Sequence, residues 1–352
     1  MKIAIIVPNL PPTFCGVYDY TRKLAEHWPT RAQWTLVCSR DGHAWPGAAV
    51  MRVKRTGASL CEALMEIGAD IVALQYTCFG YAENGIPRWL ADGLEQFKQR
   101  GKALVVVMFH ELYYTGRFYT RAFWRNSRQK AVVARLCAAA NGALTGTPAN
   151  RDEIKRVSRC RALVAPIPSN IDPVAFAEDF GKRPTRVAVF GLRDSRIRIL
   201  APFAWHEGAF ANYELVMIGA GLTEGPSERE AELIERLSPG KLDIRADTDP
   251  GAVSRALASC QVLLCPYTAE EIPKSGAAMA ALAHGLVLVA YGKPVKDGPP
   301  FVSAGRAISE SPSIQVLGDS TQLAAMGRAG REWYERNSAW AQAVAAWQKA
   351  LS

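Results

Sequence analysis

Short apolar runs alternate with amphipathic stretches along almost the whole chain. Short apolar runs predict strands at residues 2–8, 34–39, 49–53, 70–76, 103–110 and 142–148, and the nearly continuous run at 103–110 is typical of a strand buried on both faces. Between several of these runs the apolar positions recur at helical spacing, at residues 17–28, 88–101 and 128–142. Strands that alternate with helices in this way predict a parallel sheet covered by helices on both faces.

A second strand–helix series follows a proline-rich segment. Residues 165–184 contain four prolines and little periodicity, which is typical of a linker. Beyond this segment the expected strands are at 186–191, 213–219, 241–246, 260–267 and 286–292. A chain of 352 residues also suits two domains better than one core. We therefore predict two doubly wound α/β domains, residues 1–168 and 185–330, joined by a linker at 169–184.

The charge of the chain indicates an anionic partner. Lys and Arg number 42 against 33 Asp and Glu, which gives a formal net charge of +9 and a pI of about 9.2. Such a balance suits nucleic acid, an anionic membrane surface or a phosphorylated substrate. No nucleic-acid recognition motif is found in the sequence, so we expect no nucleic-acid partner.

The cysteines and the apolar runs indicate the cellular compartment. Eight cysteines are scattered without a C-x-x-C pair or zinc-ligand spacing, which indicates reduced thiols used as small core residues. No apolar run reaches the roughly 18–20 residues that span a bilayer. The first ten residues, MKIAIIVPNL, lack the parts of a signal peptide and predict a buried strand. We therefore expect a cytoplasmic protein.

Two loops at strand ends of the first domain have residues suited to a ligand. Gly16 precedes a predicted helix, where a glycine lets a ligand approach backbone N–H groups; a plain turn is the alternative. His110 and Glu111 follow the apolar strand at 103–110, and a packed or capped histidine is the alternative there. The sequence contains neither a G-x-G-x-x-G fingerprint nor a P-loop.

The second domain contains two further loops with charged residues. Arg193, Arg196 and Arg198 follow its first strand, and arginine forks suit phosphate oxygens; a solvated basic loop is the alternative. Asp247 and Asp249 have a spacing that could hold a divalent metal under a diphosphate. However, Asp249 precedes a proline and a helical run, which favours a helix N-cap, so we expect no metal.

The segment EEIPKSGAAMAALAHGL, residues 270–286, predicts an anion site. Its alanine-rich part predicts a helix that begins near Lys274, Ser275 and Gly276, with Gly285 at its C-terminal end. Unpaired N–H groups and the positive end of the helix dipole attract an anion there. Ser275 alone would explain an ordinary N-cap. A lysine in the first turn opposes the dipole, and a bound anion would remove that conflict.

Taken together, these features resemble the two-Rossmann-domain glycosyltransferases of the GT-B fold, specifically the family 4-like retaining enzymes. The resemblance rests on the order of motifs: the glycine loop, the strand-end histidine, a Pro-Ile-Pro-Ser-Asn linker, G-x-R, I-G-x-G and the E…A-x-x-H-G helix. It covers nearly the whole chain. It implies two domains facing a cleft, with the acceptor on the first and the nucleotide sugar on the second. Residues 331–352 would form a C-terminal helix that returns to the first domain.

The resemblance also implies roles for individual residues. The catalytic set is His110, Arg193, Arg198 and Lys274. The donor-binding set is Gly16, Gly191, Arg196, Gly219, Arg245, Ala246, Thr248, Glu271, Ser275, Gly276 and Ala277. The acceptor-side set is Gln75, Tyr76 and Glu111. In these sets Arg193 and Arg198 clamp the diphosphate, with Arg196 as a rival of Arg198.

The sequence departs from the family pattern in its last motif. The family has two glutamates eight positions apart, and counting back from Gly285 places them on Ile272 and Ala280. The carboxylate that binds the ribose is therefore missing, and Glu271 can serve the donor sugar only if the loop shifts by one residue. Cys15 replaces one of the paired glycines of the first loop.

The implied reaction is hexosyl transfer from a nucleotide diphosphate sugar, with a UDP-sugar expected, to a glycan or lipid-linked acceptor. Configuration would be retained, and the pathway would be polysaccharide or glycoconjugate biosynthesis without a cofactor. An idle glycosyltransferase-like subunit that binds a nucleotide or a partner is the main alternative, and a sugar-nucleotide epimerase is another. Arginines and aromatic residues at 113–130 suggest a peripheral membrane surface at the inner face, or else an ordinary solvated helix.

Overall fold

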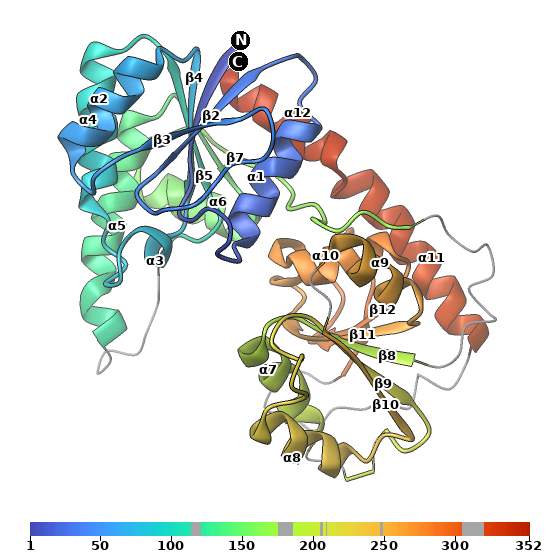
Figure 1. Cartoon of the computed structure of the whole chain (residues 1–352). Helices are drawn as coiled ribbons and strands as arrows, with labels where there is room; N and C mark the ends of the chain where they lie inside the picture. The colour runs from blue at the N-terminus through green and yellow to red at the C-terminus, as the bar shows by residue number, and fades with distance from the viewer. Residues whose placement is uncertain (114–120, 175–185, 205–206, 209, 247–248, 305–319) are drawn as a thin grey trace. The chain divides into compact units, whose positions relative to one another are not determined.

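The computed structural model describes residues 1–352 except 114–120, 175–185, 205–206, 209, 247–248 and 305–319; the side chains of 121–124 are also not described. The chain divides into two compact units. The first unit comprises Met1–Pro166 and Trp340–Ser352, and the second unit is Ile167–Ala339. Each unit contains one parallel sheet with helices on both faces, which confirms the predicted fold class (Figure 1).

The sheet of the first unit has seven strands in the order β3-β2-β1-β4-β5-β6-β7. Its strands are β1 (Lys2–Ile6), β2 (Gln33–Cys38), β3 (Ala49–Arg52), β4 (Ile71–Tyr76), β5 (Leu104–Phe109), β6 (Gly142–Thr145) and β7 (Ala162–Val164). Strand order reverses between β1 and β4, which pair in parallel from Ile3 opposite Ile71. Such a reversal leaves a crevice at the carboxyl ends of the two strands, where doubly wound sheets bind ligands.

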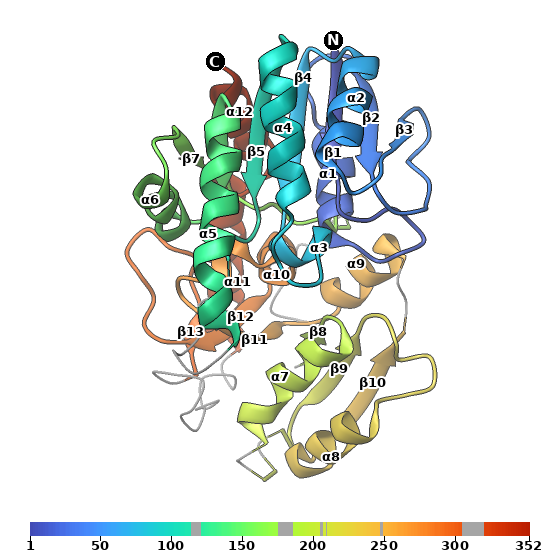
Figure 2. The same cartoon turned by 90° about the vertical axis from the view of Figure 1, so that its left-hand side faces the viewer.

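Helices cover both faces of this sheet because the central strands are apolar on both sides. The helices are α1 (Gly16–Glu26), α2 (Gly57–Ile67), α3 (Cys78–Tyr81), α4 (Arg88–Arg100), α5 (Arg121–Ala139), α6 (Pro148–Val157) and α12 (Trp340–Leu351). Figures 1 and 2 agree that α2, α4 and α5 lie on one face and that α1 and α12 lie on the other. Apolar side chains of α2, α4 and α5 form an apolar core of the unit with alternate residues of β1, β4 and β5.

The sheet of the second unit has six strands in the order β10-β9-β8-β11-β12-β13, and its order reverses between β8 and β11. Its strands are β8 (Arg186–Phe190), β9 (Glu214–Ile218), β10 (Lys241–Arg245), β11 (Val262–Thr268), β12 (Val287–Tyr291) and β13 (Val302–Ser303). Its helices are α7 (Arg193–Phe203), α8 (Glu228–Leu237), α9 (Pro250–Ala258), the 3₁₀ turn η2 (Ile272–Lys274), α10 (Gly276–Ala283) and α11 (Ser320–Asn337). Two apolar cores, one on each face, bury the sheet.

The C-terminal segment consists of two helices rather than the single helix expected at 331–352. Helix α11 packs against α10 and belongs to the second unit, whereas α12 packs against β5, β6 and β7 of the first unit. The return to the first unit therefore begins at Trp340. Gly142 at the start of β6 is close to this helix, since a Cβ built on it would lie 2.6 Å from the carbonyl oxygen of Ala350.

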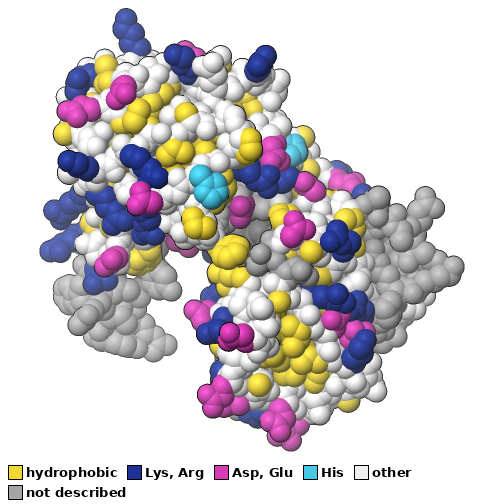
Figure 3. Space-filling view, in the orientation of Figure 1, with side chains coloured by type: hydrophobic (Ala, Val, Ile, Leu, Met, Phe, Trp, Pro, Cys, Tyr) yellow, Lys and Arg dark blue, Asp and Glu magenta, His cyan; other side chains and the backbone are white. Residues whose placement is uncertain are grey.

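The excess positive charge of the chain belongs to the first unit. Its sequence contains 24 Lys and Arg against 12 Asp and Glu, a formal charge of +12, whereas the second unit contains 18 against 21, a charge of −3. Lys and Arg side chains stand out on the face of the first unit that Figure 3 shows. None of the helices in the described parts of the chain is both long and apolar enough to cross a membrane.

Candidate functional site

Each unit presents its chemically unusual residues at the carboxyl ends of its strands, close to the point where strand order reverses. In the first unit these are Gly16, after β1, Gln75 near the end of β4, and His110 after β5. We name these three residues the first edge site. In the second unit a set after β8 and β11 comprises Gly191, Arg193, Glu271, Lys274 and Gly276. We name this set the second edge site.

His110 and Gln75 form a hydrogen bond in the first edge site. Their strands are neighbours, and the Nε2 atom of His110 lies 2.7 Å from Oε1 of Gln75. Burial lowers the pKa of His110 to about 4, so the imidazole is neutral at pH 7 and Nε2–H donates to the amide oxygen. The Gln75 side chain is fully buried, and its Nε2 has no hydrogen-bond partner among the described residues.

The other residues expected in the first unit occupy different environments. Tyr76 is fully buried, and its ring packs against Phe109 in the core, with ring centroids 5.3 Å apart. The Tyr76 side chain therefore lies in the core and is not exposed to an acceptor. Glu111 is exposed beyond the strand end. Gly16 is also exposed, and a Cβ built on it would meet no atom within 4 Å.

A residue that sequence reasoning missed is Tyr20, which packs against His110. Their ring centroids lie 5.1 Å apart at an interplanar angle of 83°. Tyr20 is one helical turn after Gly16 on α1, and both positions share a helix face. That i, i+4 spacing from a ligand-facing glycine was the available signal in the sequence.

Two glycines let the strand ends of the second unit approach each other. A Cβ on Gly219 would lie 2.4 Å from the carbonyl oxygen of Gly191, and its φ of +131° also disfavours other residues. Both glycines were expected in the donor site. Their close contact gives a structural reason for a glycine at position 219.

Arg196 is fully buried, which corrects the expectation that it contacts the donor. Its Nε donates to Oε1 of Glu230 at 2.7 Å, and its Nη1 donates to the carbonyl oxygens of Gly191 and Ala220. The pKa of Glu230 is lowered: burial raises it, but hydrogen bonds from Ser227 and Arg196 outweigh burial. The guanidinium thus joins α7, α8 and the two strand ends.

Arg193 and Arg198 are both exposed on α7, which begins at Arg193. They are five positions apart in the sequence, so they lie about 140° apart around the helix axis and about 7.5 Å apart along it. Arg193 is at the helix start next to Gly191, whereas Arg198 is in the second turn. The helix geometry therefore favours Arg193 for phosphate contact and separates Arg198 from it.

The predicted start of α10 is confirmed. The helix begins at Gly276, and Oγ of its N-cap Ser275 accepts a hydrogen bond from the Ala278 amide at 3.2 Å. Gly276 is exposed, Ala277 is partly exposed, and a Cβ on Gly276 would meet no atom within 4 Å. By helix geometry the first amides of α10 lack intrahelical partners. They are the groups available to an anion.

Glu271 and Lys274 precede this helix start and interact with each other. Oε1 of Glu271 lies 3.8 Å from Nζ of Lys274, and both side chains are exposed by at least 40%. Oε2 of Glu271 accepts from the amide of Thr268 at 3.1 Å and from its hydroxyl at 3.2 Å. Glu271 therefore stabilises its own turn, and the Lys274 side chain is exposed beside the helix start.

Ala280, where the family pattern has a glutamate, is buried in the core. It is 1% exposed in α10, and its carbonyl oxygen lies 2.6 Å from Nδ1 of His284. A carboxylate at this position would lie among apolar residues of the second unit. The missing glutamate therefore fits the local packing.

The donor-binding residues expected at and just after the end of β10 have different outcomes. Arg245 forms an ion pair with Asp243 at 2.9 Å, and Ala246 packs partly buried against the core. Thr248 and Asp247 lie outside the described residues. Asp249 caps α9 as predicted, since its carboxylate accepts from the Ala252 amide at 2.8 Å. Among the described residues no group of three or more His, Cys, Asp and Glu is arranged to hold a metal ion.

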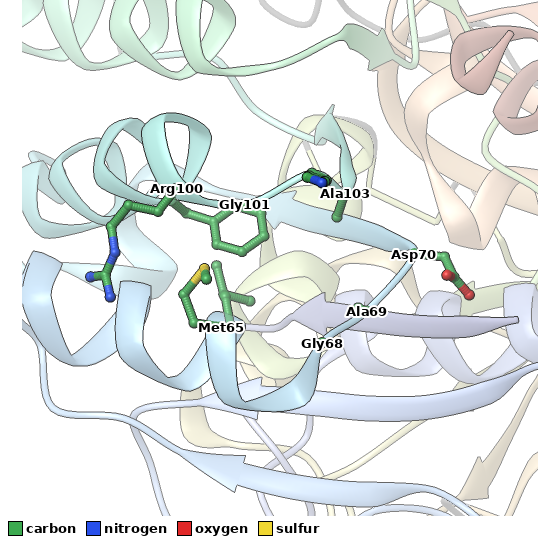
Figure 4. A pocket seen from close by; sticks show the side chains of 10 residues that line it. Met65, Gly68, Ala69, Asp70, Arg100, Gly101 and Ala103 are labelled. Carbon is green, nitrogen blue, oxygen red and sulfur yellow. The ribbon is translucent and has the colours of Figure 1, made fainter.

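A surface pocket of about 450 Å³ lies at the amino ends of β4 and β5, opposite the first edge site (Figure 4). It is lined in part by Met65 and Arg100, with Asp70 at the amino end of β4. The length of β4 therefore separates it from Gln75. The pocket contains none of the residues expected in the site.

No protein-family model matches the sequence, and a comparison with curated proteins finds no match. Solved structures do match over nearly the whole chain. A sucrose-phosphate synthase from Thermosynechococcus elongatus is 15% identical with a TM-score of 0.71, covering 99% of this chain and 97% of that one. An E. coli structure described as trehalose-6-phosphate bound with UDP-2-fluoro glucose is 9% identical with a TM-score of 0.58, covering 100% and 99%.

A third structure, the UDP-GlcNAc 2-epimerase from Neisseria meningitidis bound to UDP-GlcNAc, is 8% identical with a TM-score of 0.56 and covers 100% and 99% of the two chains. At such low identities these matches show the fold alone. They confirm that the chain has the two-domain parallel α/β architecture of the GT-B fold.

Proposed function

We propose that the chain is a glycosyltransferase that moves a sugar from a nucleotide diphosphate sugar to a glycan or lipid-linked acceptor. A UDP-sugar is the expected donor, and the reaction retains the anomeric configuration, as in family 4-like enzymes. The observation that carries the proposal is the second edge site. There the start of α10, with Lys274 beside it, offers backbone amides and positive charge at the strand-order reversal of a doubly wound sheet.

The fold matches support a nucleotide-sugar substrate. Two of the similar structures contain UDP-2-fluoro glucose and UDP-GlcNAc, according to their descriptions. Their fold extends over nearly the whole of this chain and of their own. Because the epimerase has the same fold, the fold cannot by itself select transfer over epimerisation, and the assay must include both products.

In the proposed mechanism the protein acts chiefly by electrostatics. The bond between the anomeric carbon and the diphosphate oxygen breaks, and a bond from that carbon to the acceptor oxygen forms. The departing phosphate receives the acceptor's hydroxyl proton. Arg193, Lys274 and the first amides of α10 stabilise the charge that grows on the leaving diphosphate. His110 contacts the donor sugar, and Gly16 admits the ligand to the start of α1.

The missing ribose carboxylate weakens donor binding rather than the chemical step. Binding that the ground state and transition state share affects KM and leaves kcat unchanged. The positively charged side chains that would face the developing negative charge, Arg193 and Lys274, are still present. We therefore infer a donor site with a raised KM.

A second candidate is a catalytically idle subunit that binds a nucleotide or a partner. Two observations favour it: Ala280 lies in the core, and the guanidinium of Arg196 is bound to Glu230 in the interior of the second unit. These leave fewer charged groups for the diphosphate than the family pattern has. This candidate predicts nucleotide binding without turnover.

The experiment is a thermal-shift screen against UDP-, GDP- and ADP-sugars, followed by product analysis for any ligand that binds. A ligand at 100 times its Kd adds about 2.7 kcal/mol to the free energy of unfolding, which shifts the melting temperature measurably. We expect stabilisation by a UDP-sugar and the release of UDP when an acceptor is added. Absence of stabilisation by every nucleotide sugar would contradict the proposal.

The charge of the first unit suggests where the acceptor lies. A net +12 on the unit expected to hold the acceptor suits a lipid-linked phosphate at the inner face of the membrane. Much of the stretch at 113–130 lies outside the described residues, including Arg117 and the side chain of Arg121. Near the described end of this stretch, Lys130 lies 3.6 Å from Glu153, so part of the positive charge there is offset. We propose a cytoplasmic protein bound peripherally to anionic membranes.

A further inference from the structure

The inner face of α12 presents two tryptophans to α1. Trp340 and Trp347 are seven residues apart on α12 and share one helix face. Trp347 is 1% exposed, and its Nε1 donates a hydrogen bond to the hydroxyl of Tyr20 at 2.9 Å. The Trp340 ring lies 5.2 Å from the Tyr20 ring and stacks on His27 at 5.3 Å. The end of the chain therefore holds Tyr20 at two points.

Tyr20 connects this contact to the first edge site. Its ring is 2% exposed and meets His110 edge-on, with centroids 5.1 Å apart. On another side of the imidazole, Oε1 of Gln75 accepts from Nε2 of His110 at 2.7 Å. Residues from α1 and β4 thus restrict the orientation of one imidazole ring, and α12 contacts the tyrosine that does so. All of them belong to the first unit.

The hydrogen bond to Gln75 determines which nitrogen of His110 is available. Because Nε2 carries the proton that Gln75 accepts, and because the ring is neutral, Nδ1 has a lone pair and no proton. Nδ1 has no hydrogen-bond partner among the described residues. A neutral nitrogen acceptor suits a hydroxyl proton and offers nothing to a phosphate oxygen.

We propose that Tyr20, Gln75 and Trp347 are positioning residues that hold His110 so that its Nδ1 accepts a hydrogen bond from a hydroxyl of the donor sugar. The inference rests on the proposed function, because it assumes that a sugar is brought to the first edge site. It adds that the C-terminal helix stabilises the sugar contact through Trp347 and Tyr20. The nucleotide part of the donor is not involved.

The test uses the full-length protein and the conservative variants Trp347→Phe, Tyr20→Phe and their combination. Trp347→Phe removes the indole N–H and keeps an aromatic ring at the buried position. The matched control is Trp333→Phe, which removes an indole N–H that donates to the Asp297 carbonyl oxygen at 3.0 Å in the second unit. Titration calorimetry measures Kd for the UDP-sugar selected by the screen and, separately, for UDP.

We expect the sugar nucleotide to bind about tenfold more weakly to each of the single variants, while affinity for UDP stays unchanged. The control should change neither Kd. Each single variant leaves a buried polar group without its partner, whereas the double variant removes both partners. Thermal stability should therefore recover in the double variant, and affinity for the sugar nucleotide should remain low. Equal losses for UDP and the sugar nucleotide, or recovery of both quantities together, would overturn the proposal.

The protonation of His110 gives a readout that does not depend on activity. Ring ¹⁵N chemical shifts, assigned with the variant His110→Gln, report which nitrogen carries the proton. We expect a proton on Nε2 in the wild type at pH 7, and a ring that becomes charged at pH 7 in Gln75→Glu, since a carboxylate favours the imidazolium. A proton on Nδ1 in the wild type would overturn the proposal. If no UDP-sugar binds the wild type, the proposed function fails, and the ¹⁵N result still decides the orientation of His110.

Discussion

At the scale of single residues, the proposed phosphate site is tested most directly at Lys274 and Arg193. The Lys274 side chain lies beside the start of α10 and is 44% exposed, with Glu271 as its ion-pair partner at 3.8 Å. We expect Lys274→Ala or Arg193→Ala to weaken UDP binding by about 1.5–3 kcal/mol, the scale of a charge-assisted hydrogen bond. Isothermal titration with UDP measures the change.

The matched control for this prediction is Arg198→Ala. Arg198 is exposed on the same helix as Arg193 and carries the same charge, but it lies about 140° away around the axis. Its removal should change UDP affinity much less than removal of Arg193. If Lys274→Ala and Arg193→Ala leave the affinity intact, these residues do not belong to the phosphate site.

The positions of most candidate residues could be predicted from the sequence, but their pairings could not. His110 lies at the end of an apolar run, and Lys274 and Ser275 precede an alanine-rich helix, so local pattern located them. The partner of His110 is 35 residues away in the sequence, and the partner of Arg196 is 34 away. The pairing of β4 with β5 brings Gln75 to His110, and the packing of α7 on α8 brings Glu230 to Arg196. The burial of Arg196 could therefore not be predicted from its local sequence, which placed it only among the donor-binding residues.

At the scale of secondary-structure elements, Arg196 joins α7 to α8 and to the loops after β8 and β9. Both it and Glu230 are 0% exposed. Arg196→Met keeps much of the side-chain length but leaves the Glu230 carboxylate buried without its cation. We expect a loss of about 3–5 kcal/mol in the free energy of unfolding, measured by denaturant titration.

Arg193→Met is the control for that experiment. It is the same substitution three residues earlier on α7, at an exposed position, and should change stability by less than about 0.5 kcal/mol. Equal and small effects of the two variants would show that the buried pair does not hold the elements together. The ion pair between Arg196 and Glu230 would then contribute little to the stability of the second unit.

At the scale of the whole molecule, charge is divided between the units as +12 and −3. We expect the protein to sediment with vesicles that contain anionic lipid at low salt and to be released as ionic strength rises, because salt screens such attraction. Vesicles of neutral lipid with the same size are the control. Equal sedimentation with both vesicle types at low salt would exclude an electrostatic membrane surface and leave a soluble anionic acceptor.

The central claim is that the chain transfers a sugar from a nucleotide diphosphate donor. The most direct test measures UDP release from the UDP-sugar that binds, with and without glycan and lipid-linked acceptors, and identifies the sugar product by NMR. We predict acceptor-dependent release of UDP, strongly reduced in Lys274→Ala, and a glycoside whose anomeric coupling matches the donor configuration. A protein that binds the nucleotide sugar but forms no glycoside with any acceptor, or that only interconverts it with an epimer, would contradict the claim.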